Sequence, residues 1–237
     1  MNINLKVSLG VIYILCLGLL CLFIFNYLDI KDLTSYSYLK ESSRILIDFK
    51  NNNFTLFIIL FFIFSAIWVL MLGFGSPVAI LAGFIFGKWL GTFISVISFT
   101  IGASLLYFLA RYYFSSFIKK HLSKKINKYT NLFNKNDFFY FMMFRLAGGL
   151  GIPFAVQNVL PVIFNMKLKN YFYATLLGLI PTIFIVCSLG SGIENLINDN
   201  VDLNYLTIIS DPGIYTPLIL FLTILILSYV VKKKIFK

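Results

Sequence analysis

The 237-residue sequence has few charged side chains: Asp, Glu, Lys and Arg make up 12% of it, against about a quarter in a typical soluble domain. Hydrophobic residues make up 59%, and the mean hydropathy is +0.89. This composition excludes an ordinary soluble domain. Several apolar runs also reach the ~20 residues that cross a bilayer core. We therefore expect an all-α integral membrane protein that crosses the bilayer several times.

Histidine and cysteine are scarce as well. His121 is the only histidine, and the three cysteines, Cys16, Cys21 and Cys187, lie in apolar runs without metal-ligand or disulfide spacing. One histidine cannot build a His-based metal cluster or a Ser-His-Asp triad. The sequence also shows no nucleophile–base pair. It therefore predicts no enzyme activity, no metal and no cofactor.

Acidic residues are absent from two long stretches, 51–136 and 138–193. The formal net charge is +11. In a membrane protein such an excess is typical of Lys and Arg retained in cytoplasmic loops and of contact with anionic lipids, so we expect no nucleic-acid partner. The missing carboxylates also argue against a carboxylate-based proton relay inside the membrane.

About five transmembrane helices are expected from the apolar runs. They lie at about 8–28, 54–72, 92–112, 168–190 and 214–231. The first is expected to be an uncleaved span, because no A-x-A-like site follows it. Three parts result: residues 1–53 form an N-terminal transmembrane anchor and interfacial helix, residues 54–192 a membrane domain, and residues 193–237 an acidic outer loop, the last helix and a basic tail.

Residues 114–133 have a different pattern. Apolar residues recur there at i, i+3 and i+4, while four lysines occupy most of the other face. This pattern predicts a basic amphipathic helix that lies on an anionic leaflet. A solvated cytoplasmic connector is the alternative.

Two hydrophobic segments are interrupted by glycine and proline, which loosen and kink helices. Residues 73–91 read GFGSPVAILAGFIFGKWLG, and residues 145–161 read RLAGGLGIPFAVQNVLP. Both contain G-x-P-x-A at an offset of 76 residues, and at the same offset Gly102 corresponds to Gly178. We therefore expect an internal repeat with helical hairpins at 74–90 and 145–165. Two kinked ordinary helices are the alternative.

Charge predicts the topology. Six lysines in 113–139 and four in the C-terminal tail place both in the cytoplasm, whereas 191–213 has no basic residue and is expected outside. If 74–90 dips in and returns, 29–53 lies inside with its four basic groups; if 74–90 crosses fully, 29–53 lies outside. The charges favour the first arrangement. The two re-entrant hairpins then enter from opposite sides as an inverted repeat, a recurring transporter design.

These segments resemble the VTT domain of the DedA superfamily, also called the SNARE-associated Golgi protein domain, over roughly residues 55–192. The matching residues are Pro77, Gly83, Gly87, Gly91, Gly102 and Arg111 in the first half, and Arg145, Pro153, Phe154, Asn158, Gly178 and Pro181 in the second. The resemblance implies two opposed re-entrant hairpins. It also implies a role in lipid scrambling or flipping, in proton-linked transport or in envelope maintenance. One departure is the glycine-rich AGGLG that replaces a family proline after the second arginine.

Arg145 is the strongest candidate for a binding residue. A guanidinium near the membrane interior is costly unless it is paired, and it binds phosphate in a bidentate way. Its expected partners are backbone carbonyls, Gln157, Asn158 or a lipid phosphate; the alternative is that it snorkels to the cytoplasmic interface. Arg111 ends a span and joins these substrate-binding candidates, with interfacial anchoring as its alternative.

The remaining marked residues are assigned to hairpin geometry. They are Gly75, Pro77, Gly83, Gly87, Gly148, Gly149, Gly151, Pro153, Pro161, Gly178 and Pro181. Gln157 and Asn158 have a second interpretation, in which their side chains cap the carbonyls of the second hairpin.

The function expected from these observations is movement of lipid or another anionic solute across the cell inner (plasma) membrane, as in a scramblase, flippase or transporter. An ion-coupled carrier for a small solute and a scaffold that supports envelope integrity are the alternatives. Membrane lipids are the expected partners, with anionic head groups near 114–133. A homo-oligomer is left open.

Overall fold

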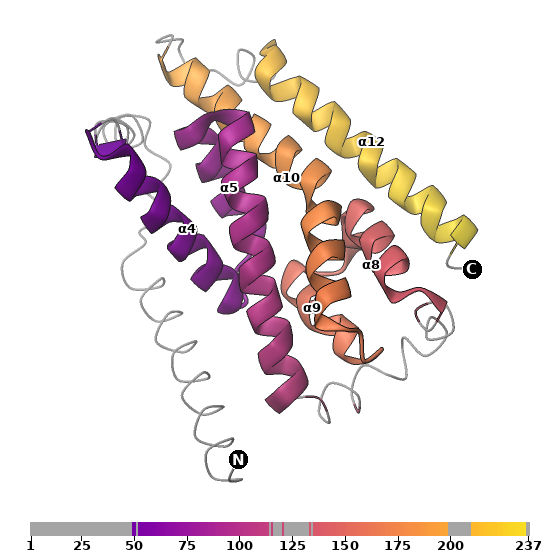
Figure 1. The fold of residues 1–237 in the computed structure, drawn as a ribbon. Helices are drawn as coiled ribbons and strands as arrows, with labels where there is room; N and C mark the ends of the chain where they lie inside the picture. Colours follow the sequence, from indigo (N-terminus) through magenta and orange to yellow (C-terminus); the bar gives the residue numbers. More distant parts are fainter. Residues whose placement is uncertain are drawn as a thin grey trace. The chain divides into compact units, whose positions relative to one another are not determined.

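The computed structural model describes residues 49–50, 52–113, 115, 120, 133, 135–198 and 210–235. The chain divides into two compact units, Met1–Asn52 and Asn53–Lys237, and the second holds every element considered below. Its described residues are helical or lie in turns and short connections, without a β-strand among them (Figure 1). The predicted span at 8–28, nearly all of 29–53 and most of the basic helix at 114–133 lie outside the described residues.

Four longer helices correspond to the predicted spans from 54 onward. The elements are α4 (Phe54–Leu70), α5 (Gly75–Tyr113), α8 (Asp137–Leu146), η2 (Gly148–Gly151), α9 (Phe154–Val159), η3 (Leu160–Val162), α10 (Leu168–Asn198) and α12 (Pro212–Ile235). Two helical stretches, Gly75–Tyr113 and Leu168–Leu196, are long and apolar enough to cross a membrane. Shorter apolar helices are formed by Phe54–Leu70 and Pro212–Thr223. The all-helical class is therefore as predicted for the described residues.

Helix α5 is a helical hairpin. Gly87 has φ 76° and ψ 169°, a conformation that side-chain-bearing residues rarely adopt, and it separates a short arm (75–86) from a long arm (88–113). A Cβ atom on Gly91 would lie only 2.6 Å from the carbonyl oxygen of Ala82. One on Gly75 would lie 3.2 Å from the ring of Phe99. The short arm therefore folds back along the long arm, and the predicted break in 74–90 is a turn at Gly87. The returning arm is the start of the long helix and not a separate segment ending at residue 90.

The packing of α4 on α5 is repeated by α8 on α10. A Cβ atom on Gly102 would collide with the carbonyl oxygen of Ala66 in α4, and one on Gly178 would lie 3.1 Å from the carbonyl oxygen of Met142 in α8. The two contacts are equivalent under the offset of 76 residues found in the sequence. Ala66 corresponds to Met142, and Gly102 corresponds to Gly178. Each glycine allows the same close approach of two helices. The repeat is thus present in the packing as well as in the motif.

The two copies run in opposite directions. Near the start of α10, the hydroxyl of Tyr171 lies 3.3 Å from the carbonyl oxygen of Ala103, in the second half of α5. Near the end of α10, Gly83 at the tip of the α5 hairpin packs against the backbone of Cys187. Helix α10 is therefore antiparallel to the long arm of α5, as the ribbon in Figure 1 also shows.

The second hairpin is less regular than the first. Gly148, Gly149 and Gly151 have φ values of 64°, 73° and 79°, so the glycine-rich run turns the chain sharply after α8. Pro153 then precedes α9 as its N-cap residue, and Pro161 lies in η3. The part of the hairpin that follows the glycine-rich turn is therefore a short α-helix, α9, continued by the 3₁₀ turn η3.

Two residues assigned to hairpin geometry lie elsewhere. Gly178 and Pro181 are both within the long helix α10. Gly178 acts through the helix contact described above, and the fixed ring of Pro181 falls in the interior of the helix, where it removes one backbone hydrogen bond.

Candidate functional site

Arg145 lies in the last turn of α8 and is only 1% exposed. Its Cζ atom is 5.0 Å from the ring centroid of Phe141 and 5.4 Å from that of Phe154. Aromatic faces attract guanidinium groups at such distances. The alternative in which Arg145 snorkels to the interface is therefore wrong: the side chain is inside the protein.

Three neutral side chains accept hydrogen bonds from Arg145. Its Nη1 donates to Oε1 of Gln157 at 3.1 Å, and its Nη2 donates to Oδ1 of Asn158 at 2.5 Å and to the hydroxyl of Tyr171 at 3.3 Å. The guanidinium has five N–H donors, so these bonds leave two. One of these belongs to Nε, which has no partner in the part of the chain that is described.

None of these acceptors carries a charge. An ionised group inside a protein is costly unless an opposite charge or several hydrogen bonds compensate it. Arg145 has the hydrogen bonds but no carboxylate among them. The hydrogen-bond partners of the guanidinium therefore leave its charge uncompensated.

Gln157 and Asn158 were predicted either to cap the second hairpin or to contact Arg145, and Gln157 does both. Its Nε2 donates to the carbonyl oxygen of Ile152 at 2.6 Å while its Oε1 accepts from Arg145. Asn158 is fully buried, and its Nδ2 has no acceptor among the described residues. Both amides thus hold the arginine in place from one short helix.

Tyr171 completes the group and was missed in the sequence. It is fully buried, and its hydroxyl accepts from Arg145 while it lies 3.3 Å from the carbonyl oxygen of Ala103 and 3.2 Å from that of Asn158. One hydroxyl proton can donate to only one of these carbonyls at a time. In the sequence, Tyr171 belongs to an aromatic run, YFY, that looks like an ordinary lipid-facing surface. Its position seven residues before Gly178 places both on one helical face, which is the only signal available.

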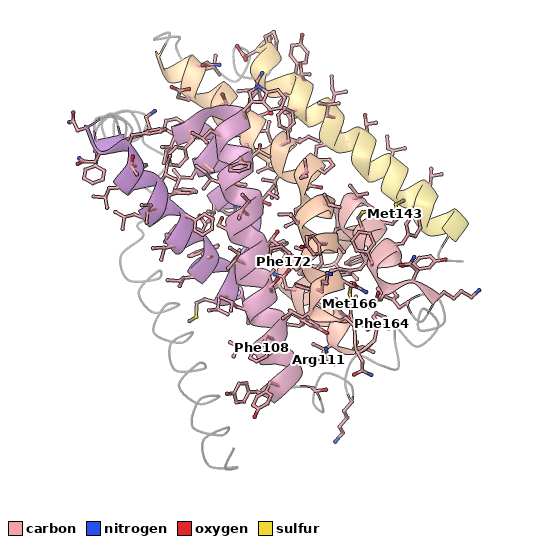
Figure 2. The ribbon with its side chains drawn as sticks, in the orientation of Figure 1. Phe108, Arg111, Met143, Phe164, Met166 and Phe172 are labelled. Atoms are coloured by element: carbon pink, nitrogen blue, oxygen red, sulfur yellow. The ribbon has the colours of Figure 1, made fainter. Side chains whose placement is uncertain are left out.

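Arg111 lies apart from this group. Its Nη1 donates to the carbonyl oxygen of Met166 at 2.9 Å, and Tyr107 donates to the same oxygen at 2.5 Å. Figure 2 shows Arg111 beside Met166 at the end of the long arm of α5. The ring of Tyr107 stacks on that of Tyr171 with centroids 4.5 Å apart, so the two arginines flank a stacked tyrosine pair. The contacts of Arg111 fit the anchoring alternative.

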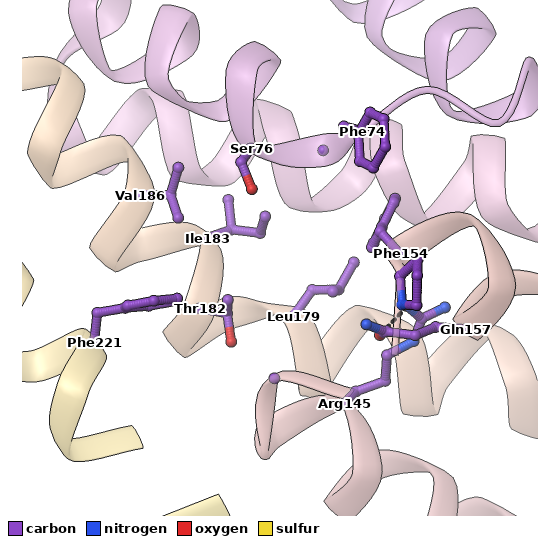
Figure 3. A pocket seen from close by; sticks show the side chains of 13 residues that line it. Phe74, Ser76, Arg145, Phe154, Gln157, Leu179, Thr182, Ile183, Val186 and Phe221 are labelled. Atoms are coloured by element: carbon purple, nitrogen blue, oxygen red, sulfur yellow. Dashed lines mark hydrogen bonds between the residues drawn. The ribbon is translucent and has the colours of Figure 1, made fainter. Parts of the chain in front are cut away.

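A cavity of about 230 Å³ lies beside Arg145, between the two copies of the repeat (Figure 3). Both G-x-P motifs border it, the first through Gly75 and Ser76 and the second through Pro153 and Phe154. The other lining residues are Phe74, Arg145, Gly148, Gln157, Leu179, Thr182, Ile183, Val186 and Phe221. The wall is thus mostly apolar, with one cation and a few neutral polar groups.

The described residues contain no group of three or more His, Cys, Asp or Glu side chains that could hold a metal ion. The chemistry of the cavity is that of a cation and hydrogen-bond donors in an apolar wall. Such a wall strengthens electrostatic attraction for a ligand that enters.

Comparison with known proteins identifies the family. The family model described as the VTT domain matches residues 69–192, which include both hairpins and Arg145. The chain is 33% identical over 159 residues to YqeD of Bacillus subtilis (strain 168), covering 66% of this chain and 68% of YqeD. It is 23% identical over 176 residues to the Transmembrane protein 41 homolog of Caenorhabditis elegans, covering 72% of this chain and 70% of that protein. No solved structure matches. The chain belongs to the VTT-domain family of the DedA superfamily.

Proposed function

We propose that the protein moves lipid, or another anionic solute, across the cell inner (plasma) membrane, as a scramblase, flippase or transporter and not as an enzyme. One observation carries this proposal. A buried arginine that has no carboxylate partner among the described residues borders a cavity that is shared by two antiparallel copies of one repeat. A cation in that position lowers the cost of bringing a negative group between the two halves.

The hairpins supply the geometry for such movement. We place them as re-entrant segments that enter the bilayer from opposite sides, with 113–139 and the C-terminus in the cytoplasm. Non-helical backbone such as that of Gly148 and Gly149 persists at membrane depth only where protein or a water-filled cavity satisfies it. Two facing hairpins supply the surrounding protein and enclose a cavity. They also shorten the apolar barrier that a head group has to cross.

Each polar residue has a proposed role. Arg145 attracts the anion, and Gln157 and Asn158 hold the guanidinium while offering amide donors of their own. Arg111 anchors the end of α5 through the carbonyl oxygen of Met166 and has no part in binding the anion. The basic segment 114–133 gathers anionic lipids near that end.

The size of the cavity also fits a second candidate function, that of an ion-coupled carrier for a small anion. A space of about 230 Å³ is below the roughly 300–1,000 Å³ of sites that enclose drug-sized ligands. It accommodates a head group, with the acyl chains left in the bilayer, or a small solute whole. An ion-coupled carrier for a small anion would use the same residues.

Reconstitution into liposomes with labelled lipids tests the proposal. We expect lipid movement that is lost in Arg145→Ala and kept in Arg111→Ala, the matched control. Equal lipid movement in Arg145→Ala and the wild type would contradict the role of Arg145. Uptake of a labelled small anion without lipid movement would favour the carrier, and neither activity would favour a membrane scaffold.

A further inference from the structure

We propose that the N-terminus of α5 binds the same anion as Arg145, so that each copy of the repeat supplies one half of a site for a phosphate-type oxyanion. This inference rests on the proposed function and names a second binding element for the cavity. Arg145 belongs to the second copy, and the α5 N-terminus belongs to the first. The anion would thus bridge the two.

The first turn of α5 opens on the cavity with two backbone N–H groups, those of Gly75 and Ser76, because Pro77 has none. Gly75 and Ser76 both line the cavity, and the N–H groups of a first helical turn have no acceptor within their own helix. Phe74 precedes the helix, and its side chain cannot cap these donors as Ser, Asp or Asn would. The aligned peptide dipoles add a partial positive charge at this end.

Arg145 is the independent observation that points to a ligand. It is 1% exposed, it lines the same cavity, and its Nε has no partner within the described segments. The ring of Phe154 lies close to both elements. Its centroid is 5.4 Å from Cζ of Arg145, and its Cε1 atom would lie 3.6 Å from a Cβ atom on Gly75. Figure 3 shows Phe154 between Phe74 and Arg145 in this way.

The chemistry of the two elements selects the ligand class. A guanidinium and backbone N–H groups are all donors, so the ligand needs several acceptor oxygens on one centre. One negative charge balances Arg145, since no carboxylate of the described residues borders the cavity. The surrounding Leu179, Ile183 and Val186 offer no further charge to a larger polyanion. Inorganic phosphate and the phosphodiester of a lipid head group both meet these requirements.

Ser76→Asp tests the inference by placing a carboxylate at the helix end. The new charge would complement the helix dipole and Arg145 and thereby take the place of the anion. The full chain in neutral detergent is titrated with inorganic phosphate against chloride at equal ionic strength, and the melting temperature is followed. Because phosphate also stabilises proteins by exclusion from their surface, the specific signal is the saturable shift that is absent from Ser76→Asp.

We expect a saturable upward shift in the wild type and in Ser76→Ala, which keeps the backbone donors. In Ser76→Asp the apparent affinity should fall about tenfold or more, with the melting temperature in chloride unchanged or raised. Asn195→Asp controls for the added charge, because Asn195 is exposed and lies near the end of α10 outside the cavity lining. It should bind like the wild type.

A second titration, with dioctanoyl phosphatidylglycerol, distinguishes a lipid head group from a free anion as the ligand. A Ser76→Asp-sensitive shift with this lipid alone identifies a lipid head group, and an equal shift with inorganic phosphate identifies the free anion; either supports the inference. A shift that is lost in Arg145→Gln but unchanged in Ser76→Asp would overturn the role of α5 and leave the proposed function standing. The absence of any saturable shift in the wild type would overturn the site itself, whereas lipid movement in liposomes reports separately on the function.

Discussion

Gly178 of α10 packs directly against the Cβ atom of Arg145, so the position of the buried guanidinium depends on the absence of a side chain one helix away. Adding a methyl group in Gly178→Ala should push α8 off α10 and cost about 1–3 kcal/mol of stability, as overpacking of tight interfaces does. The lipid movement of folded Gly178→Ala should also fall, because Arg145 shifts with α8.

Gly102→Ala is the matched control for that variant. Gly102 makes the corresponding contact with Ala66 in the first copy, where no charged residue is displaced. Thermal unfolding should show a similar loss for both variants, and transport normalised to folded protein should fall for Gly178→Ala alone. An equal fall in both would show that the helix contact matters and the guanidinium position does not.

Tyr171→Phe removes one acceptor from Arg145 without changing the ring that stacks on Tyr107. A buried hydrogen-bond partner lost in this way costs about 1–3 kcal/mol, and the freed Nη2 donor should turn toward the cavity or Asn158. We expect weaker transport with the fold retained. Tyr173→Phe, on the same helix but 48% exposed, should behave as the wild type. Unchanged transport in Tyr171→Phe would remove Tyr171 from the positioning group.

Gln157→Glu keeps the shape of the side chain and adds a negative charge next to Arg145. The carboxylate should pair with Nη1, which Gln157 already contacts at 3.1 Å, and so neutralise the cation. Anion-dependent stabilisation and lipid movement should be lost. Glutamate also lacks the N–H that Gln157 donates to the carbonyl oxygen of Ile152, so the melting temperature is measured to confirm that the variant is folded. Asn195→Asp again controls for charge. Normal transport by a stable Gln157→Glu protein would contradict the need for an uncompensated cation.

Gly87→Ala tests the turn of the first hairpin. No atom of the described residues lies within 4 Å of a Cβ atom at this position, so the penalty comes from the φ of 76°. Such strain costs about 1–3 kcal/mol, measurable as a lower melting temperature in detergent. A neutral result would show that the two arms can join through another backbone conformation.

Membrane topology can be read by labelling single cysteines in a background without Cys16, Cys21 and Cys187. A cysteine at a position in 29–53 should react with an impermeant reagent only after the cells are opened, whereas one in 199–209 should react in intact cells. Efficient labelling of 29–53 from outside would overturn the re-entrant assignment of 74–90.

The repeat was the part of the fold that the sequence predicted best, because small residues recur at the same offset in both copies. Gly102 and Gly178 are required by helix contacts that recur, and G-x-P marks a helix start in both copies. The turn at Gly87 was harder to place, since five glycines between 73 and 91 are compatible with several break points. Only the backbone conformation distinguishes the glycine at the turn from those that serve close packing.

The site was predictable in part for a similar reason. Arg145, Gln157 and Asn158 stand out as polar residues in an apolar chain, and the structure brings all three together. Tyr171 does not stand out, because a tyrosine among aromatic residues has no compositional contrast. Arg111 stands out as strongly as Arg145 but meets a carbonyl at a helix end, so polarity alone does not separate a buried cation from a surface anchor.

The shared offset has a consequence for how the two halves divide their work. The residues of the first copy that correspond to Arg145, Gln157 and Asn158 are Val69, Leu81 and Ala82, as subtraction of 76 shows. Val69 is as deeply buried as Arg145 and touches Gly102 as Arg145 touches Gly178. The helix contact is thus repeated while the charge is not. The cation that borders the cavity belongs to one copy alone, and the corresponding position of the other copy is an aliphatic side chain.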